Sequence, residues 1–182
     1  MKHGPGDRRC RHQGRRHRRP SRRRPHERGR HRDIVVLAVP YPALDDVLAK
    51  RADRLEGKVV VDITNPLNFE TFDSLTVAPD GSAAAELAQR LPSATVLKAF
   101  NTTFAAALAS GSVGDAPTTV LIAGDDVAAK TALADLVTAG GLRALDAGTF
   151  SRARELEAMG FLQITLAAAE RLPWTGGFAV QS

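Results

Sequence analysis

Three short polar runs follow apolar stretches of this sequence, and their residue types suit the binding of a polar ring. Residues 38–41 read AVPY, residues 62–66 read DITNP, and residues 98–102 read KAFNT. In open α/β sheets, ligands bind outside the carboxyl ends of the strands. Amide, hydroxyl and proline groups at three such ends could therefore line one crevice. Val-Pro and Asn-Pro also make good turns after strands, so the pattern alone leaves a purely structural role open.

The side chains that many enzymes use as nucleophiles and bases are missing from most of the chain. All five histidines and the single cysteine lie before residue 33. Residues 33–182 therefore cannot hold a Ser-His-Asp triad, a Cys-His pair or a common zinc site, and we assign no catalytic side chain and no metal ligand. Carboxylate or cofactor chemistry remains. The adjacent acids Asp125 and Asp126 begin a helix, where capping is the commoner role than acid–base catalysis.

The charge and composition of the chain change abruptly between Arg32 and Asp33. Residues 1–32 hold 14 of the 25 basic residues and only two acids, a net +12, whereas residues 33–182 carry 11 basic and 18 acidic residues, a net −7. The first composition predicts a disordered segment. The second part is long enough to bury roughly 70% of its unfolded surface. No apolar run approaches the ~18–20 residues of a membrane span, so we expect no membrane segment.

Cysteine usage and the absence of a leader pattern bear on the compartment. The basic N-terminal stretch is not followed by the apolar core and cleavage site of a secretory signal. Disulfides cannot support residues 33–182, because these residues contain no cysteine. We therefore expect a cytoplasmic protein.

Strand and helix patterns alternate from residue 33 onward. Pro42, Ser82 and Ser151 are expected near helix starts. This rhythm predicts an α/β fold with a doubly wound parallel sheet, in which right-handed helical crossovers join the strands. The predicted strands are 34–39, 58–63, 94–100, 118–123 and 142–146. The predicted helices are 42–54, 82–90, 103–110, 126–140 and 151–172, with an irregular segment at 67–81.

A glycine-rich phosphate loop is absent from the sequence. Dinucleotide-binding folds normally carry G-x-G-x-x-G between the first strand and helix, where the helix N-terminus holds the pyrophosphate. No such motif follows a predicted strand here, and residues 4–6 (GPG) precede no strand. Pyrophosphate binding thus has no visible residues.

Five segments, taken in order, carry a family resemblance: DIVVLAVPYPAL (33–44), GKVVVDITNPLN (57–68), LPSATVLKAFNT (91–102), VLIAGDDVAAK (120–130) and LDAGTFSRARELEAM (145–159). Together they resemble the NADP-dependent oxidoreductases related to coenzyme F420-dependent NADP reductase. The resemblance implies a Rossmann-type fold that binds NADP(H) and an enzyme that transfers hydride to a ring acceptor such as coenzyme F420. It also implies a small-molecule redox acceptor as partner and a possible homo-oligomer. Hydride transfer between two stacked rings needs orientation and no protein nucleophile.

The resemblance also implies cofactor-binding residues on all three strand ends, namely Val39, Pro40, Tyr41, Asn65, Pro66, Asn101, Thr102 and Ala105. Val39, Pro40 and Tyr41 would lie along the cofactor near its nicotinamide half. Asn101, Thr102 and Ala105 would face the nicotinamide or the acceptor ring. Asn65 and Pro66 would form a neighbouring wall.

The resemblance begins after the point where the family carries its glycine-rich half. A βαβ unit takes ~30 or more residues, and residues 1–32 stand in its place. We expect a partial Rossmann-type domain at 33–182 that lacks the N-terminal βαβ half and binds dinucleotide poorly or not at all. Our hypothesis for residues 1–32 is an out-of-frame translation, or a misassigned start, of a GC-rich gene, because shifted GC-rich codons produce Arg, Pro, Gly and His runs.

Two other functions stay open on the sequence. The first is a catalytically inactive fragment. The second is a nucleic-acid-binding protein whose basic arm neutralises phosphates; without an aromatic residue to stack on bases, this arm would bind non-specifically. In either case, removing half of a sheet would leave an apolar edge strand, which favours an oligomer or poor solubility.

Overall fold

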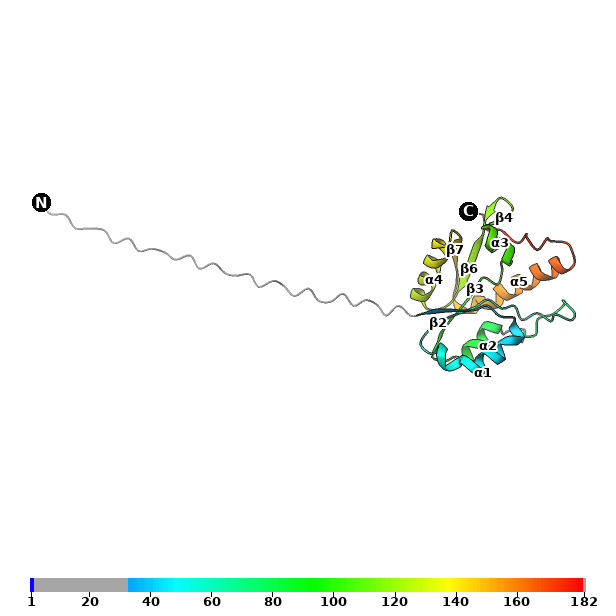
Figure 1. Cartoon of the computed structure of the whole chain (residues 1–182), viewed down its shortest axis with the longest axis horizontal. Coiled ribbons are helices and arrows are strands. Elements are labelled where there is room, and N and C mark those ends of the chain that lie inside the picture. Colours follow the sequence, from blue (N-terminus) through cyan, green and yellow to red (C-terminus); the bar gives the residue numbers. More distant parts are fainter. Residues whose placement is uncertain (2–32, 182) are drawn as a thin grey trace. The chain divides into compact units, whose positions relative to one another are not determined.

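Five apolar runs of the sequence pair as the strands of one sheet in the computed structural model, which describes Met1 and residues 33–181 (Figure 1). The strand order is β1-β2-β3-β6-β7. The bounds are β1 Ile34–Leu37, β2 Val59–Asp62, β3 Thr95–Ala99, β6 Thr119–Ala123 and β7 Arg143–Gly148. A separate two-stranded antiparallel sheet joins β4 (Ser112–Val113) to β5 (Ala116–Pro117). The predictions for residues 1–32 fall almost wholly outside the described residues and stay predictions.

The five-stranded sheet is mixed. β1, β2 and β3 run parallel to one another, β6 runs antiparallel to β3, and β7 runs parallel to β6. The predicted α/β class is confirmed, but the strand direction differs from a wholly parallel sheet at one pairing. The helix between β3 and β6 is six residues long, or ~9 Å at 1.5 Å per residue. A five-residue strand is ~16 Å long. The chain therefore does not return along the sheet before β6, and β6 starts from the edge at which β3 ends.

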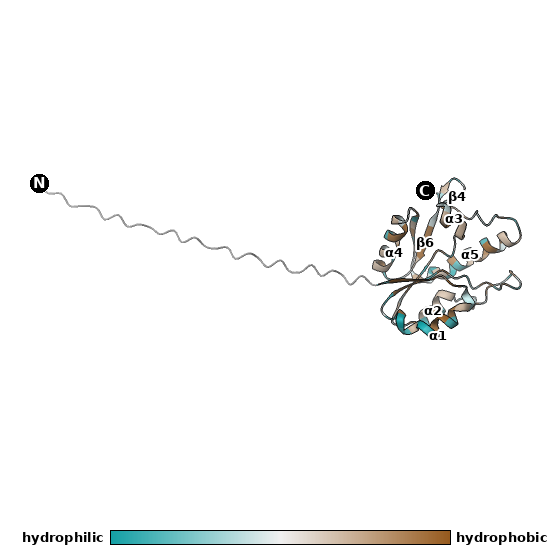
Figure 2. Cartoon of the chain, viewed as in Figure 1, coloured by the Kyte–Doolittle hydropathy of each residue, from teal (hydrophilic) through white to brown (hydrophobic). Residues whose placement is uncertain are grey.

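Two layers of helices cover the sheet. The helices are α1 Leu44–Leu55, α2 Ala83–Arg90, α3 Ala105–Ser110, α4 Val127–Ala139 and α5 Ala153–Ala168, with 3-10 turns at Tyr41–Ala43 and Phe150–Arg152. Leucines of α1 and α2 pack on one face of β1, β2 and β3. α4 packs on the other face (Figure 1). Figure 2 shows the amphipathic pattern behind this arrangement, since α1 carries both hydrophilic and hydrophobic patches.

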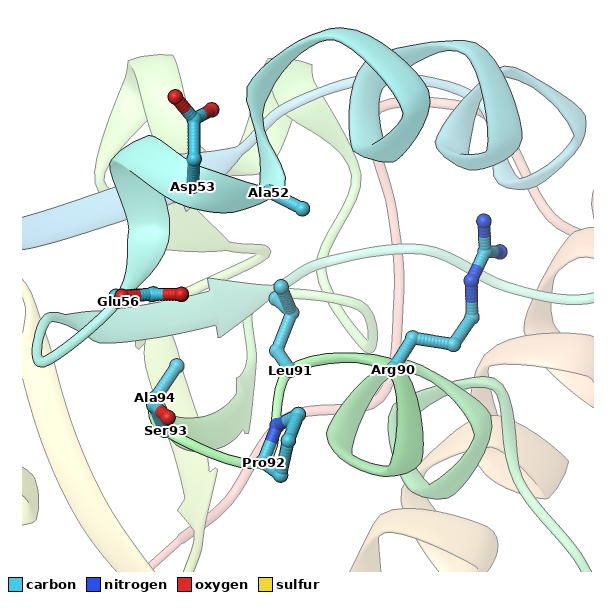
Figure 3. A pocket seen from close by; sticks show the side chains of 8 residues that line it. All are labelled: Ala52, Asp53, Glu56, Arg90, Leu91, Pro92, Ser93 and Ala94. Atoms are coloured by element: carbon cyan, nitrogen blue, oxygen red, sulfur yellow. The ribbon is translucent and has the colours of Figure 1, made fainter.

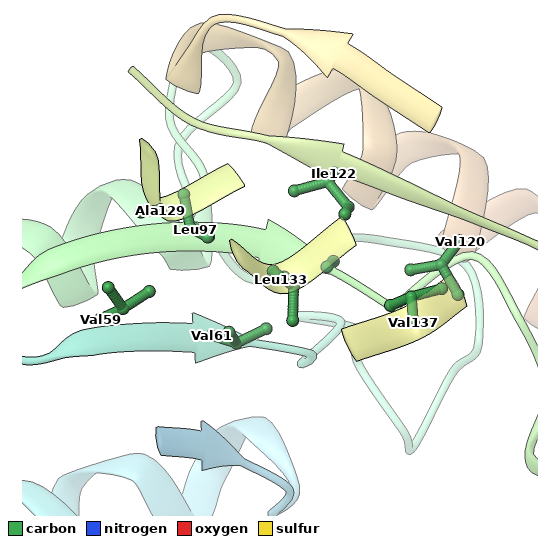
Figure 4. Packing of buried hydrophobic residues seen from close by; sticks show 9 residues of the cluster. Val59, Val61, Leu97, Val120, Ile122, Ala129, Leu133 and Val137 are labelled. Atoms are coloured by element: carbon green, nitrogen blue, oxygen red, sulfur yellow. The ribbon is translucent and has the colours of Figure 1, made fainter. Parts of the chain in front are cut away.

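The core on the α4 face brings together residues from three strands and one helix. Val61, Leu97 and Ile122 are at most 1% exposed, and Leu133 of α4 lies among them (Figure 4). All four residues of β2 are buried, as expected of a strand with a neighbour on each side and helices on both faces. β1 lies at the outside of the sheet, and its Val36 is 45% exposed. The prediction of an exposed apolar edge strand agrees with this position.

Two of the three expected helix starts are as predicted. Pro42 lies in the 3-10 turn that leads into α1. The Ser82 hydroxyl accepts a hydrogen bond from the Ala85 backbone N–H at 3.0 Å and caps α2. Ser151 caps no helix: it lies inside a 3-10 turn, and its hydroxyl pairs with that of Thr149 at 2.8 Å. α5 consequently begins two residues later than expected, and it ends at Ala168 instead of residue 172.

The aspartates before α4 play structural roles. Asp126 Oδ1 accepts a hydrogen bond from the Ala129 backbone N–H at 2.9 Å, which confirms the predicted cap. Asp125 Oδ1 accepts from the Phe150 backbone N–H at 2.8 Å and so ties this turn to the start of the last helical segment. Both carboxylates thus accept backbone N–H groups at the start of helical segments.

Candidate functional site

The three predicted strand ends meet at one edge of the sheet. β1, β2 and β3 are parallel neighbours, so residues 38–41, 63–66 and 100–105 all leave the sheet on the same side. The second and third of these loops are joined by two hydrogen bonds. Asn101 Nδ2 donates to Asn65 Oδ1 at 2.9 Å, and Asn65 Nδ2 donates to the Asn101 carbonyl oxygen at 2.9 Å. The sequence therefore placed these two asparagines together correctly.

Helix α5 lies directly against this pair. Asn101 Nδ2 also donates to the Leu156 carbonyl oxygen at 2.8 Å. A Cβ atom on Gly160 would lie 2.4 Å from Asn65 Oδ1 and 2.9 Å from the Asn101 carbonyl oxygen. Only a residue without a side chain permits this approach, because ordinary contacts of a Cβ are 3.4–4 Å. α5 thus closes the back of the two loops.

The backbone turns sharply where β3 ends. Phe100 has a φ of +63°, in the left-handed region that L-residues with a Cβ seldom adopt. Such a conformation costs ~1–2 kcal/mol, and the packing of Phe100 against the α4-side core offsets it. The Phe100 carbonyl oxygen accepts from the Thr103 N–H at 3.2 Å. This turn directs Asn101 toward α5, and strain of this kind clusters at binding sites.

Beneath the loops lies a buried cluster of three charged side chains. Lys98 and Asp62 are 0% exposed and Glu157 is 1% exposed. Lys98 Nζ lies 2.8 Å from Asp62 Oδ2 and 2.9 Å from Glu157 Oε1. The Glu157 carboxylate also accepts from the N–H groups of Ala83 at 2.9 Å and Ala84 at 3.2 Å, at the N-terminus of α2. The cluster therefore joins two strands and two helices.

Burial has the largest effect on the pKa of Glu157. Loss of hydration raises the pKa of its carboxyl group, although the neighbouring Lys98 and the two α2 N–H groups act in the opposite direction. This cluster was not predicted from the sequence. A signal was present, because Asp62 and Lys98 lie within predicted strands, and a buried charge needs a partner.

The first loop is tied to helix α2. The Tyr41 hydroxyl donates to Glu86 Oε2 at 2.6 Å. Burial, and then the hydrogen bond and charge of Glu86, raise the pKa of the Tyr41 hydroxyl. Tyr41 therefore faces the groove between α1 and α2. Pro40 is exposed and Val39 is half-buried at the end of β1.

The other predicted residues differ in how far a ligand can reach them. Ala105 is exposed and Asn65 is half-buried. Asn101 and Thr102 are 7% and 5% exposed, and Pro66 is also buried. The buried members support the surface from behind. Pro40 and Ala105 are the members of the predicted set that the structure leaves exposed.

The described residues fit the nicotinamide half of NADP(H) better than its pyrophosphate half. Val39, Pro40 and Ala105 supply apolar side chains after strands β1 and β3, and the Asn65–Asn101 pair supplies amide groups. Asn101 Oδ1 and Thr64 Oγ1 are buried without a hydrogen-bond partner, so polar capacity remains at this edge. Over residues 33–181, no strand–turn–helix supplies a glycine-rich phosphate loop. The turn into α4, residues 124–126, carries two carboxylates, and these repel phosphate.

Three cavities lie away from the asparagine pair. One, of about 180 Å³, lies between the C-terminal ends of α1 and α2 and is lined by Asp53, Glu56 and Arg90 among others (Figure 3). A second, of about 180 Å³, lies between α1 and α2 beside Tyr41. A third, of about 330 Å³, lies where α2 and α5 begin. None of these three has Asn65 or Asn101 in its lining.

Comparison with known proteins decides the family. A family model described as NADP oxidoreductase, coenzyme F420-dependent, matches residues 13–66, which include β1, α1 and β2. F420-dependent NADP reductase of Methanocaldococcus jannaschii is 32% identical over 150 residues, covering 79% of this chain and 66% of that protein. The chain belongs to the F420-dependent NADP oxidoreductase family.

One further sequence relative and two solved structures are also similar to this F420-dependent NADP oxidoreductase family member. Metalloreductase STEAP3 of Rattus norvegicus is 39% identical over 127 residues, covering 70% of this chain and 25% of that protein. A crystal structure described as an F420-dependent NADP-reductase from Arthrobacter sp. FB24 superposes with a TM-score of 0.71 at 28% identity, covering 82% of this chain and 69% of that one. Protein SMa0349 from Sinorhizobium meliloti gives a TM-score of 0.59 at 30% identity, covering 65% and 58%.

The chain spans 25% and 66% of the two curated relatives, so it matches less than two thirds of either length. Within the residues that the structure describes, no helix combines the length and apolar character needed to cross a bilayer.

Proposed function

We propose that the carboxyl edge of β1, β2 and β3 binds the nicotinamide half of NADP(H) and supports hydride transfer to a ring acceptor such as coenzyme F420. The observation that carries this proposal is the convergence of residues 38–41, 63–66 and 100–105 at one edge, with the second and third loops joined by the Asn65–Asn101 pair. Membership of an NADP-dependent family supports it.

The chain's own residues supply orientation. When bound, the nicotinamide ring would provide or accept the hydride, and no protein nucleophile is needed. Pro40 and Ala105, both exposed, are the apolar residues of the predicted set that a ring could contact. The Asn65–Asn101 pair and α5 keep that surface at a fixed position, and fixed positioning of two reactants is the main contribution a protein makes to such a transfer.

NADPH fluorescence tests the proposal, with a matched pair of variants on α3. Ala105 and Ala109 are both exposed, and Ala109 lies one turn further from the predicted site. Ala105→Glu adds a carboxylate next to an anionic cofactor, so affinity should fall about tenfold or more, which corresponds to ~1.4 kcal/mol. Ala109→Glu should leave the affinity close to that of the unmodified chain. An equal effect of both variants would contradict the proposed location.

The acceptor is tested by hydride transfer. A fall in the absorbance of oxidised F420 after NADPH is added to the full chain would support F420 as the acceptor, in spite of the weak dinucleotide binding that the missing phosphate loop predicts. If NADPH binds and F420 is not reduced, another ring acceptor is required. If NADPH does not bind at all, the chain as written is an inactive member of the family.

A further inference from the structure

Lys98 uses its full hydrogen-bonding capacity within the fold. Its ammonium group donates to Asp62 Oδ2 at 2.8 Å and to the Thr64 carbonyl oxygen, and it lies 2.9 Å from Glu157 Oε1. An ammonium has three N–H donors, and this arrangement uses all three. Lys98 and Asp62 are 0% exposed and Glu157 is 1% exposed. The side chain is therefore fixed from three directions, by β2, the loop after β2, and α5.

The peptide groups of Thr64 are held on both sides. The Thr64 N–H donates to Asp62 Oδ1 at 2.8 Å, and the Thr64 carbonyl oxygen accepts from Lys98 Nζ. Asn65 is the next residue, and its side chain makes the pair with Asn101. The Lys98–Asp62 pair therefore sets the position of Asn65 by holding the peptide groups of Thr64, the residue before it.

Stability alone is a weak reason for such a cluster. Replacing a buried ion pair with uncharged residues is often neutral or stabilising, because each buried charge loses its hydration. Here three charges converge directly under the loop that carries Asn65. Glu157 also holds the N-terminus of α2 through the Ala83 and Ala84 N–H groups. The network thus fixes the spacing between this loop, α2 and α5.

We propose that Lys98 is a positioning residue for the nicotinamide-side wall of the site. It sets the path of residues 64–66 and the position of α5, and it acts on the ligand through Asn65 without touching it. The effect on ligand binding that this inference predicts rests on the proposed function. Its structural consequence, the immobilisation of residues 64–66, does not depend on that function.

Three variants of the full chain test the proposal. Lys98→Met leaves two buried carboxylates unpaired. The triple variant Asp62→Asn, Lys98→Met, Glu157→Gln removes all three charges and keeps an oxygen at residue 62 for the Thr64 N–H. Leu133→Ala is the control, because it weakens the core on the α4 face and removes none of the three charges.

Hydrogen exchange provides the first measurement. We expect the triple variant to regain most of the denaturation midpoint that Lys98→Met loses, while amides of residues 63–65 still exchange about tenfold faster or more, since a charge-assisted hydrogen bond is lost. Leu133→Ala should change exchange in this loop only as far as it changes global stability. Exchange at residues 63–65 equal to the unmodified chain in the triple variant would overturn the proposal.

Affinity for reduced nicotinamide mononucleotide provides the second measurement, because this probe carries only the nicotinamide half. The triple variant should bind it about 10- to 100-fold more weakly, as misplacements near 1 Å cost up to ~100-fold. Leu133→Ala should bind it as the unmodified chain does. Unchanged binding in the triple variant would overturn the positioning role. If the unmodified chain does not bind the probe, the proposed function fails, and the exchange result still decides whether Lys98 holds the loop.

Glu157→Gln covers the case in which the triple variant does not fold. It keeps the Lys98–Asp62 pair, so the amides of residues 63–65 should exchange at the unmodified rate. Residues 83–84 should exchange faster, because their acceptor loses its charge. Acceleration of both segments alike would show that Lys98 does not hold the loop by itself, and would overturn the proposal.

Discussion

Replacing Gly160 with alanine tests the close approach of α5 to the asparagine pair. In a helix interior, this change by itself should stabilise the protein by ~1 kcal/mol, because alanine has the higher helix propensity. The new Cβ would lie 2.4 Å from Asn65 Oδ1, whereas ordinary contacts begin at 3.4 Å. The carboxamide must therefore move by about 1 Å, and its bond from Asn101 Nδ2 is lost.

The expected magnitude follows from these terms. Overpacking costs ~1–3 kcal/mol and the lost hydrogen bond ~1 kcal/mol. After the propensity gain, a net destabilisation of ~2 kcal/mol remains, which lowers the Tm by about 4–8 °C for a chain of this size. Urea denaturation followed by circular dichroism measures the free energy of unfolding, and a thermal scan measures the Tm.

A control on the same helix isolates the propensity contribution. Ala158 is exposed on α5, so Ala158→Gly should cost ~1 kcal/mol through propensity alone. Gly160→Ala should then destabilise in spite of its favourable propensity. A Gly160→Ala protein that is more stable than the unmodified chain by the amount that Ala158→Gly loses would refute the close contact.

Three further predictions concern titration and capping. Tyr41 is the only tyrosine in the sequence, so the ultraviolet absorbance of tyrosinate reports the ionisation of its hydroxyl directly. The midpoint of this titration should lie above the ordinary pKa of 10.0. A midpoint at 10.0 in the folded chain would contradict the Glu86 contact. Because that pKa is raised on folding, the stability it contributes should fall as pH rises above 10, and Tyr41→Phe should flatten this fall in urea denaturation curves. The pKa of Glu157 is raised from 4.5, so at this site the folded chain holds more protons than the unfolded chain. The free energy of unfolding should therefore decline as pH rises from about 4.5 through the raised pKa. Glu157→Gln should remove that segment of the stability–pH curve, and an unchanged curve would argue against the buried carboxyl. Asp126→Ala removes the cap on the Ala129 N–H and should cost ~1 kcal/mol of unfolding free energy, whereas Asp126→Asn should restore most of it. An Asp126→Ala chain as stable as the unmodified one would show that the cap contributes nothing.

Local patterns predicted the elements of this fold well. β-branched runs gave β2 and β3, and Ser82 and Asp126 gave two helix starts, because these signals depend on neighbouring residues. The direction of β6 could not be read in the same way. It depends on how far a six-residue helix carries the chain, a length that the repeating strand–helix rhythm concealed.

The site was predicted in part. Asn65 and Asn101 were placed together because parallel strand ends share an edge. Lys98 was overlooked, because a lysine within an apolar run gives no indication of its partners until the helix carrying Glu157 is packed in three dimensions. Tyr41 was expected along the cofactor, and only the packing of α2 brought Glu86 to its hydroxyl. Contacts between distant elements thus account for most of what the sequence could not show.

Few backbone hydrogen bonds join the two halves of the sheet, which are β1, β2 and β3 on one side and β6 and β7 on the other. Only Lys98 and Ala99 of β3 pair with β6, opposite Ala123 and Ile122. Resistance to mechanical force depends on how many ladder hydrogen bonds must break together, and this junction has few of them. A pulling experiment across the sheet should therefore separate β1, β2 and β3 from β6 and β7 at this line first. The strand end that carries Asn101 is then the first part of the site to lose its support under load.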